Sequence, residues 1–145
     1  MDLQTLAYDY LRSFYGRFYR WGGDDPSGFD CSGLAVEFLQ SFGMMPHNKD
    51  LTAQELFDLF RNKAHKPDFI RFGSLLFFGD DLGSINHVAI ALGKHFLIGA
   101  EGGHRGVKTV EDAIKANAFI KIRPIKYRGE PVAVCTPLYH WIVIK

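Results

Sequence analysis

The sequence lacks any long hydrophobic run. Its 145 residues contain no apolar stretch that approaches the ~20 residues needed to span a bilayer. Its first residues, Met1 to Gln4, do not form a basic segment followed by an apolar one, as a secretory signal would. We therefore expect no membrane span and no export signal. The chain is then cytoplasmic as synthesised, or other machinery delivers it to its place of action.

The sequence also lacks an excess of charge of either sign. The 17 basic and 16 acidic residues leave a formal charge of +1, spread along the whole chain. No sequence-wide field exists to hold a polyanion, so we expect no nucleic-acid partner. No Cys, His and carboxylate cluster has metal-ligand spacing, and we expect no metal and no other cofactor. Without repeats or a linker, residues 1–145 are predicted to form a single domain.

Cysteine is scarce, with only Cys31 and Cys135 present. A lone disulfide is not needed in a chain that is 47% hydrophobic, so both thiols are predicted to be free. Cys135 falls in an apolar, strand-like segment and is expected to lie in the core.

The first half of the sequence has the periodicity of amphipathic helices. Apolar residues recur at helical spacing in residues 3–14, in residues 31–43 and after Leu51. Thr52 and Glu55 have the spacing of a capping box that would begin the third helix. Arg20–Gly28 is dense in turn formers and is expected to be an ordered loop.

The second half has the texture of strands joined by tight turns. The predicted strands cover residues 74–78, 87–92, 96–100, 119–125 and 132–135. A short helix is expected from Val110 to Ala116, with Thr109 as its cap. Helices followed by a mainly antiparallel sheet predict an α+β domain with the N-terminal helices packed on the sheet.

Cys31 is the first candidate for chemistry. It lies between a Gly-rich loop and an apolar helical segment, so it is expected at a helix N-terminus. There the unpaired N–H groups and the helix dipole favour the thiolate, which is the nucleophilic form, and they can stabilise an oxyanion. Most cysteines are inert, however, and this position alone does not identify a nucleophile.

His87 is the best-placed base for such a thiol. It opens a predicted strand in the sheet half, where it can face a helix-start cysteine from the helical half. The other histidines lie in polar connectors, a turn or the terminal segment. Only His104, in the Gly-rich stretch Gly102–Gly106, competes with it.

Three strings in the sequence carry a family resemblance. Tyr19–Gly23 (YRWGG), Gly28–Leu34 (GFDCSGL) and His87–Gly93 (HVAIALG) resemble, in this order and separation, the NlpC-type family of papain-like cell-wall cysteine peptidases. The short, one-domain form is similar to phage or prophage members. The resemblance implies a papain-like fold, with Cys31 as nucleophile and His87 as general base.

The resemblance also implies a substrate site around Tyr19, Asp30 and Ser32, which would recognise the free N-terminus of a peptide stem. A carboxylate and two hydroxyls suit an ammonium group. Asp30 or Ser32 can equally serve only as a helix cap, and Tyr19 as core. Trp21 is interpreted as packing that floors the cleft.

One family position is not matched. A polar residue about a dozen positions beyond the base usually orients the imidazole, and here Gly99 stands in that place. Glu101 lies two residues on, on the same face of the strand, and its carboxylate would select the useful tautomer and stabilise imidazolium. His104, a water or a backbone carbonyl are the alternatives. The catalytic residues that we expect are therefore Cys31, His87 and Glu101.

The resemblance implies a cysteine endopeptidase that cuts the amide bond between D-glutamate, through its side chain, and the diamino acid of the peptidoglycan stem. Stem peptide is then the partner, with phage tail components as further partners of a phage protein. Two alternatives stay open. One is an amidase or acyl transferase on the same scaffold. The other is a lapsed enzyme, marked by Gly99, that is kept as a tail or wall-binding component.

Overall fold

The computed structural model describes residues 2–20, 24–25, 28–46, 50–103 and 106–142. The helices are α1 (Leu3–Arg12), α2 (Cys31–Ser41), α3 (Ala53–Phe60) and α4 (Val110–Ala116). The strands are β1 (Asp24–Asp25), β2 (Gly28–Phe29), β3 (Leu75–Gly79), β4 (Ile85–Ala91), β5 (Phe96–Glu101), β6 (Phe119–Pro124) and β7 (Ala133–Cys135). Short 3-10 turns are η1 (Arg61–Lys63), η2 (Pro67–Phe69) and η3 (Ile125–Arg128).

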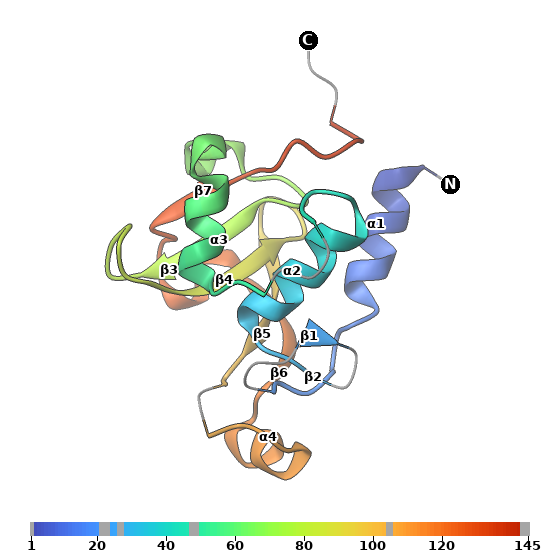
Figure 1. Cartoon of the computed structure of the whole chain (residues 1–145), viewed down its shortest axis with the longest axis vertical. Helices are drawn as coiled ribbons and strands as arrows, with labels where there is room; N and C mark the ends of the chain where they lie inside the picture. The colour runs from blue at the N-terminus through green and yellow to red at the C-terminus, as the bar shows by residue number, and fades with distance from the viewer. Residues whose placement is uncertain (1, 21–23, 26–27, 47–49, 104–105, 143–145) are drawn as a thin grey trace.

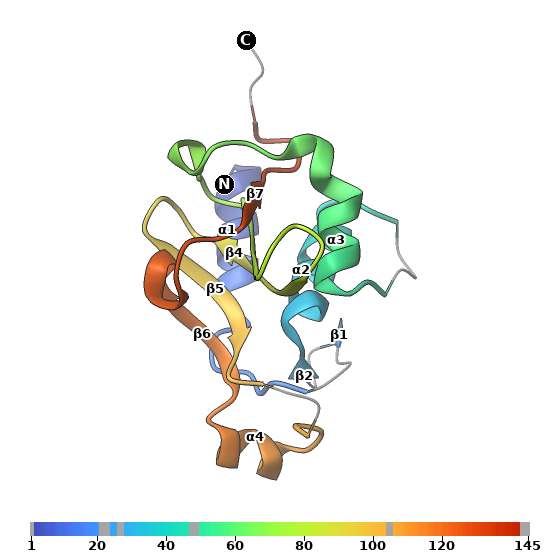
Figure 2. The same cartoon turned by 90° about the vertical axis from the view of Figure 1, so that its left-hand side faces the viewer.

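Five strands form one sheet in the order β6-β5-β4-β3-β7, with every neighbouring pair antiparallel. The helices α1, α2 and α3 lie beside this sheet, whereas α4 projects at the end of the molecule opposite the C-terminus (Figure 1; Figure 2). Helices first and an antiparallel sheet afterwards confirm the predicted α+β class.

Strand alternation divides the core between the two faces of the sheet. Leu75, Phe77, Val88 and Ile90 face the helices and join a cluster with side chains of α1, α2 and α3. The intervening residues of β3 and β4 face the other way. Four of them, Leu76, Phe78, Ala89 and Ala91, form a second cluster with Ile70, Leu97, Ile125 and Val134. Each fully buried Leu, Ile or Phe contributes about 1.5–3 kcal/mol, so both faces stabilise the fold.

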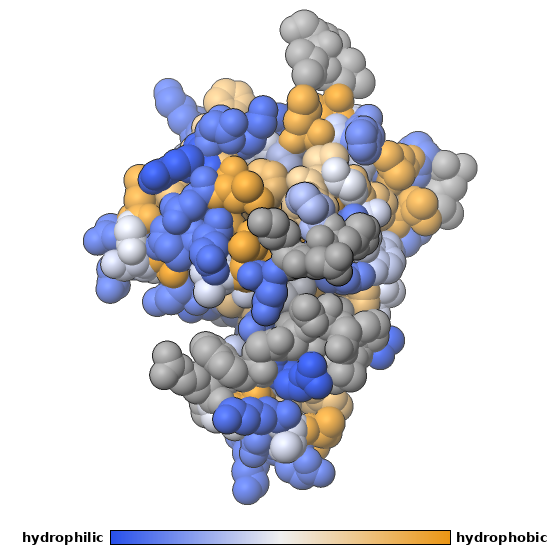
Figure 3. Space-filling model, viewed as in Figure 1, coloured by the Kyte–Doolittle hydropathy of each residue, from blue (hydrophilic) through white to orange (hydrophobic). Residues whose placement is uncertain are grey.

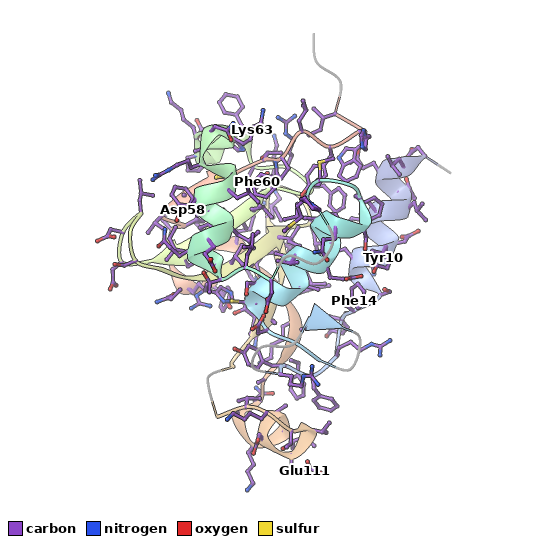
Figure 4. All side chains as sticks on the ribbon, in the orientation of Figure 1. Tyr10, Phe14, Asp58, Phe60, Lys63 and Glu111 are labelled. Atoms are coloured by element: carbon purple, nitrogen blue, oxygen red, sulfur yellow. The ribbon has the colours of Figure 1, made fainter. Side chains whose placement is uncertain are left out.

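The helix starts follow the polar residues expected to cap them. Thr52 and Glu55 form a complete capping box on α3, and Thr109 caps α4 as predicted. Such caps contribute about 1 kcal/mol each. Tyr10 on α1, labelled in Figure 4, donates a hydrogen bond to Glu37 on α2 at 2.7 Å, and this bond joins the first two helices.

Most predicted element boundaries were wrong by one or two residues. The first helix ends at Arg12 rather than continuing to residue 14, and Gly16 then takes a positive φ of 85°. The β1–β2 hairpin lies inside the predicted loop, because strands of two residues have no periodicity to read. The strand of His87 begins earlier, at Ile85, because Ile85 pairs with Gly79 across a bulge.

No helix in the described residues is both long enough and apolar enough to cross a bilayer.

Candidate active site

His87 and Glu101 face each other where β4 and β5 diverge. The two strands pair at Ile90 with Ile98 and at Ala91 with Leu97, and the same register carried further sets His87 opposite Glu101. The Nε2 atom of His87 lies 2.9 Å from Oε1 of Glu101. Both side chains are buried, with 8% and 4% of their surfaces exposed. The expected contact between His87 and Glu101 is therefore present.

Cys31 is the first residue of α2, as predicted. Asp30 caps this helix by accepting a hydrogen bond from the Gly33 N–H at 2.7 Å. The half-buried Cys31 thiol and the His87 imidazole line the same cleft, and their interaction is one of the causes that raise the pKa of His87. Because Glu101 holds Nε2, the other ring nitrogen, Nδ1, is the one left for the sulfur. One imidazole thus joins the helix-start thiol to the strand-end carboxylate.

The charges of this trio support one another. Burial alone would lower the pKa of His87, but its hydrogen bonds and charge interactions with Cys31 and Glu101 outweigh that effect and raise it from 6.5 to about 9. Burial acts to raise the pKa of Glu101, and the hydrogen bond and charge of His87, helped by Tyr127 and Arg128, lower it instead. The pair is therefore stable as imidazolium and carboxylate at neutral pH.

Two residues that the sequence analysis missed hold the far side of Glu101. The Tyr127 hydroxyl donates to Oε2, and Arg128 Nη1 donates to the same oxygen at 3.2 Å. Both come from η3, which follows β6 and lies 26 and 27 residues from Glu101 in the chain. No local sequence signal connects them to it.

A cleft of about 650 Å³ opens over the thiol and the imidazole. Its lining consists of Tyr19, Asp30, Cys31, Ser32, Thr52, Ala53, Ile85, Asn86, His87, Ala100, Gly102, Gly103 and Arg128. Figure 3 shows the outline of the molecule notched between its main body and the projection that carries α4. The thiol is thus accessible rather than sealed under packing.

The structure places three of the four predicted substrate-binding residues at this cleft. Tyr19 is only 5% exposed, so it is both core and lining. Burial, and then the charges of Cys31 and Asp30, raise its pKa and keep the phenol protonated. Ser32 Oγ lies 3.3 Å from Asp30 Oδ1. Trp21, like the alternative third residue His104, lies outside the described residues.

The second cysteine lies apart from the cleft. Cys135 is fully buried in β7, where it pairs with Leu75, and both cysteines are free, as predicted. Burial raises the pKa of the Cys135 thiol to about 11, so it stays protonated and unreactive at neutral pH. Within the described ranges, no group of three or more His, Cys, Asp or Glu side chains is arranged to hold a metal ion.

Comparison with known families shows the family of this chain. The model of the NlpC/P60 family matches residues 16–124. The chain belongs to the NlpC/P60 family. NlpC/P60 proteins are generally cysteine peptidases or hydrolases of peptidoglycan, and peptidoglycan is the substrate that the family implies. The resemblance read from the three strings, and the fold that it implied, are confirmed.

Solved structures share the fold of this NlpC/P60 domain. An NlpC/P60 family protein of Bacillus cereus ATCC 10987 has a TM-score of 0.70 and 24% identity, over 94% of this chain and 41% of its own. The NlpC/p60 domain of the peptidoglycan hydrolase SagA has a TM-score of 0.66 and 24% identity, over 93% of this chain and 99% of its own. At such identities the likeness shows the papain-like NlpC/P60 fold alone.

A sequence relative is closer in identity. Protein P54 of Enterococcus faecium is 38% identical over 88 residues, which are 60% of this chain and 15% of that protein. The chain thus spans a small part of P54 and less than half of the Bacillus cereus protein.

Proposed function

We propose that this chain is a cysteine endopeptidase that hydrolyses the bond between the side-chain carboxyl of D-glutamate and the diamino acid of the peptidoglycan stem. One observation carries the proposal: His87 lines an open cleft together with the half-buried thiol of Cys31, and it bonds the buried carboxylate of Glu101. This is the arrangement of a nucleophile, a base and an orienting group.

The proposed reaction has two steps. Cys31 Sγ attacks the amide carbonyl while His87 carries the thiol's proton, and the imidazolium then gives that proton to the leaving amine. A water molecule, deprotonated by His87, attacks the resulting thioester and releases the acid and the free thiol. Glu101 keeps the proton on Nε2 and stabilises the imidazolium that forms between the two transfers.

The oxyanion would form beside the first turn of α2. The N–H groups at a helix N-terminus have no partner in the preceding turn, and their dipoles point toward developing negative charge. Because the Gly33 N–H already donates to Asp30, the backbone N–H groups of Cys31 and Ser32 are the ones left to stabilise the oxyanion. This placement follows from Cys31 being the first residue of the helix.

Substrate orientation would come from the polar wall next to the thiol. Asp30 supplies a negative charge, and Tyr19 and Ser32 supply hydroxyls, all on the lining of the cleft. Together they suit the ammonium group of a stem peptide whose N-terminus is free. The proposed enzyme would therefore favour trimmed stem peptides over stems still attached to glycan.

Two other activities would also proceed through an acyl-enzyme on Cys31. An amidase would release the whole stem from the lactoyl group, and an acyl transferase would pass the acyl group to an amine instead of water. The lapsed-enzyme alternative was based on the missing side chain at Gly99, and Glu101 beside His87 removes the reason for it.

We further propose that the chain acts in the cytoplasm or is delivered to the wall by phage machinery, with tail components as partners. Pull-down from infected cells would test this proposal.

Product analysis tests the proposal. A free-amine tripeptide of L-alanine, D-glutamate linked through its side chain, and a diamino acid is incubated with the native chain and read by mass spectrometry. We expect the Ala-Glu dipeptide and the free diamino acid. An isomer linked through the main-chain carboxyl of D-glutamate is the control substrate. Intact tripeptide, or equal cleavage of the isomer, would contradict the proposed bond.

A further inference from the structure

Two side chains from one turn close over the carboxylate of Glu101. Tyr127 and Arg128 both donate to Oε2, while His87 occupies Oε1. Each carboxylate oxygen therefore has a partner, and the plane of the group is fixed. Tyr127 and Arg128 are both partly exposed, at 42% for Tyr127 and 36% for the Arg128 side chain, and Arg128 also lines the cleft.

The turn that carries these residues is anchored in the core. Ile125, its first residue, is 5% exposed in the second hydrophobic cluster, and its N–H donates to the carbonyl of His95 at 2.9 Å. Gly129 ends the turn with a φ of +95°, a conformation that favours glycine. The positions of Tyr127 and Arg128 thus follow from the fold and not from a mobile loop end.

The Phe78 ring lies beside both Arg128 and His87. The guanidinium carbon of Arg128 lies 5.3 Å from the centre of the Phe78 ring, and the Phe78 and His87 ring centres are 5.8 Å apart. Arg128 and His87 therefore share one aromatic platform. On the other side, the Arg123 guanidinium lies 5.8 Å from the centre of the Tyr127 ring.

A buried glutamate in this place needs such support. Glutamate has three rotatable side-chain bonds, and Glu101 starts two residues beyond the position from which relatives usually provide the third group. Burial also favours its neutral form, which cannot stabilise imidazolium. The titratable or charged groups facing it are His87 from β4, Tyr127 and Arg128 from η3, and Lys121 from β6. Of these, Tyr127 and Arg128 are bonded to the oxygen that His87 leaves free.

We propose that Tyr127 and Arg128 are positioning residues, which hold the Glu101 carboxylate in the orientation and ionised state that His87 requires. This inference deepens the proposed function and rests on it. Tyr127 fixes the direction of Oε2 through a neutral hydroxyl. Arg128 adds positive charge beside the carboxylate, whose own side chain is only 4% exposed. Both residues act through Glu101, to which their hydrogen bonds go.

The variants that test this are Tyr127→Phe, Arg128→Gln and Arg128→Lys. The matched controls are Lys126→Gln, on the same turn with a 77% exposed side chain, and Tyr15→Phe, an exposed tyrosine far from the cleft. The midpoint of the His87 titration is measured by NMR with ¹⁵N-labelled histidine, and kcat and KM are measured on the tripeptide. Thermal melting shows that each variant is folded, and if one variant fails to fold the other residue's variants make the test.

If the residues position Glu101, Tyr127→Phe and Arg128→Gln each lower kcat roughly ten- to a hundredfold and change KM by less than about twofold. The His87 midpoint falls, Arg128→Lys lies between Arg128→Gln and the native chain, and the controls match the native chain. A His87 midpoint that rises in Tyr127→Phe would overturn the proposal, because it would mean that the hydroxyl only withdraws charge from an already fixed carboxylate. An unchanged midpoint would overturn it too.

Arg128 has an alternative role, which the same measurements would establish or exclude. As a cleft residue it can bind a substrate carboxylate directly. In that case Arg128→Gln raises KM, leaves kcat and the His87 midpoint unchanged, and overturns the positioning role of Arg128. The titration needs no substrate. A native chain that cleaves no peptide would refute the proposed function, while the titration would still decide whether the two residues hold Glu101.

Discussion

The carboxylate of Glu101 occupies the space that a side chain on Gly99 would fill. A Cβ atom built on Gly99 would lie 2.7 Å from Glu101 Oε1 and 3.1 Å from the Cβ of Ala89. Residues two apart on a strand face the same side, so Glu101 reaches back along β5 to His87. The two positions work as a unit: the glycine leaves room, and the longer side chain from two residues on enters it.

Gly99→Ala is therefore expected to lower activity without unfolding the chain. The new methyl group would displace the Glu101 carboxylate by a few tenths of an ångström or more and weaken its bond to His87. We expect kcat to fall about tenfold in peptide hydrolysis. Gly93→Ala is the matched control, because nothing lies within 4 Å of its added Cβ. Equal activity in both variants would show that the room at Gly99 is not needed.

Glu101→Gln tests the role of the charge. Tyr127 and Arg128 both donate to Oε2, so they would select the amide oxygen and turn the NH₂ group toward His87 Nε2. The imidazole would then hold its proton on Nδ1 and could not accept one from the thiol. We expect kcat to fall roughly 10²- to 10⁴-fold, as for tautomer errors in other triads. Glu130→Gln, an exposed change, is the control.

The same variant has a predicted pH signature. His87 must carry a proton in order to donate it to the leaving amine, so activity falls on the alkaline side as His87 loses that proton. Loss of the Glu101 charge removes one of the causes that raise the His87 pKa to about 9. The alkaline limb of the kcat profile should therefore move to lower pH in Glu101→Gln. An alkaline limb that stays at the same pH would show that this limb does not report the ionisation of His87.

Stability should depend on pH through His87. The unfolded chain loses this proton near 6.5, whereas the folded chain keeps it to about 9. The free energy of unfolding contributed by His87 is thus fully present below about pH 6.5 and is lost as pH rises through about 9, by a few kcal/mol at most. Urea unfolding of the native chain and His87→Gln at pH 6 and pH 9.5 measures it. The same pH dependence in both chains would count against the raised pKa.

Asp30→Asn separates charge from capping. Asparagine caps helices about as well as aspartate, so α2 should keep its start and melting should change little. The lost charge should raise KM about tenfold for peptides with a free N-terminus, or ~1.4 kcal/mol of binding. N-acetylated peptides should show no such change. Asp58→Asn, on the exposed side of α3, is the control, and a uniform effect on both substrates would contradict ammonium binding.

Local patterns predicted most of the elements, and they placed Cys31 at the start of a helix and His87 near the start of a strand, as the structure has them. The capping residues Thr52 and Thr109 marked helix starts correctly, because a cap is a contact between near neighbours. The two-residue period of a strand was enough to bring Glu101 to the face of Gly99, even though its link to His87 spans 14 residues. Short-range geometry therefore explains much of the site.

What the sequence could not predict depends on contacts between distant segments. Tyr127 and Arg128 meet Glu101 only because η3 folds back over the face of the sheet, on which Ile125 is buried. The early start of β4 depends on its pairing with β3 and on Gln54, whose Oε1 accepts a hydrogen bond from the Ile85 N–H at 2.8 Å. Neither relation leaves a periodic or local trace. The position of Glu101 could be predicted from the two-residue period of its strand, but the residues that hold its carboxylate could not.

The central claim is that the thiol of Cys31 carries out the hydrolysis. The most direct measurement is the rate of tripeptide cleavage by the native chain, by Cys31→Ala and by Cys135→Ala, at equal concentrations of folded protein. We expect that Cys31→Ala has no rate above the uncatalysed background and that Cys135→Ala, which loses the buried thiol, keeps the native rate. Cleavage by Cys31→Ala at a rate near that of the native chain would contradict the claim.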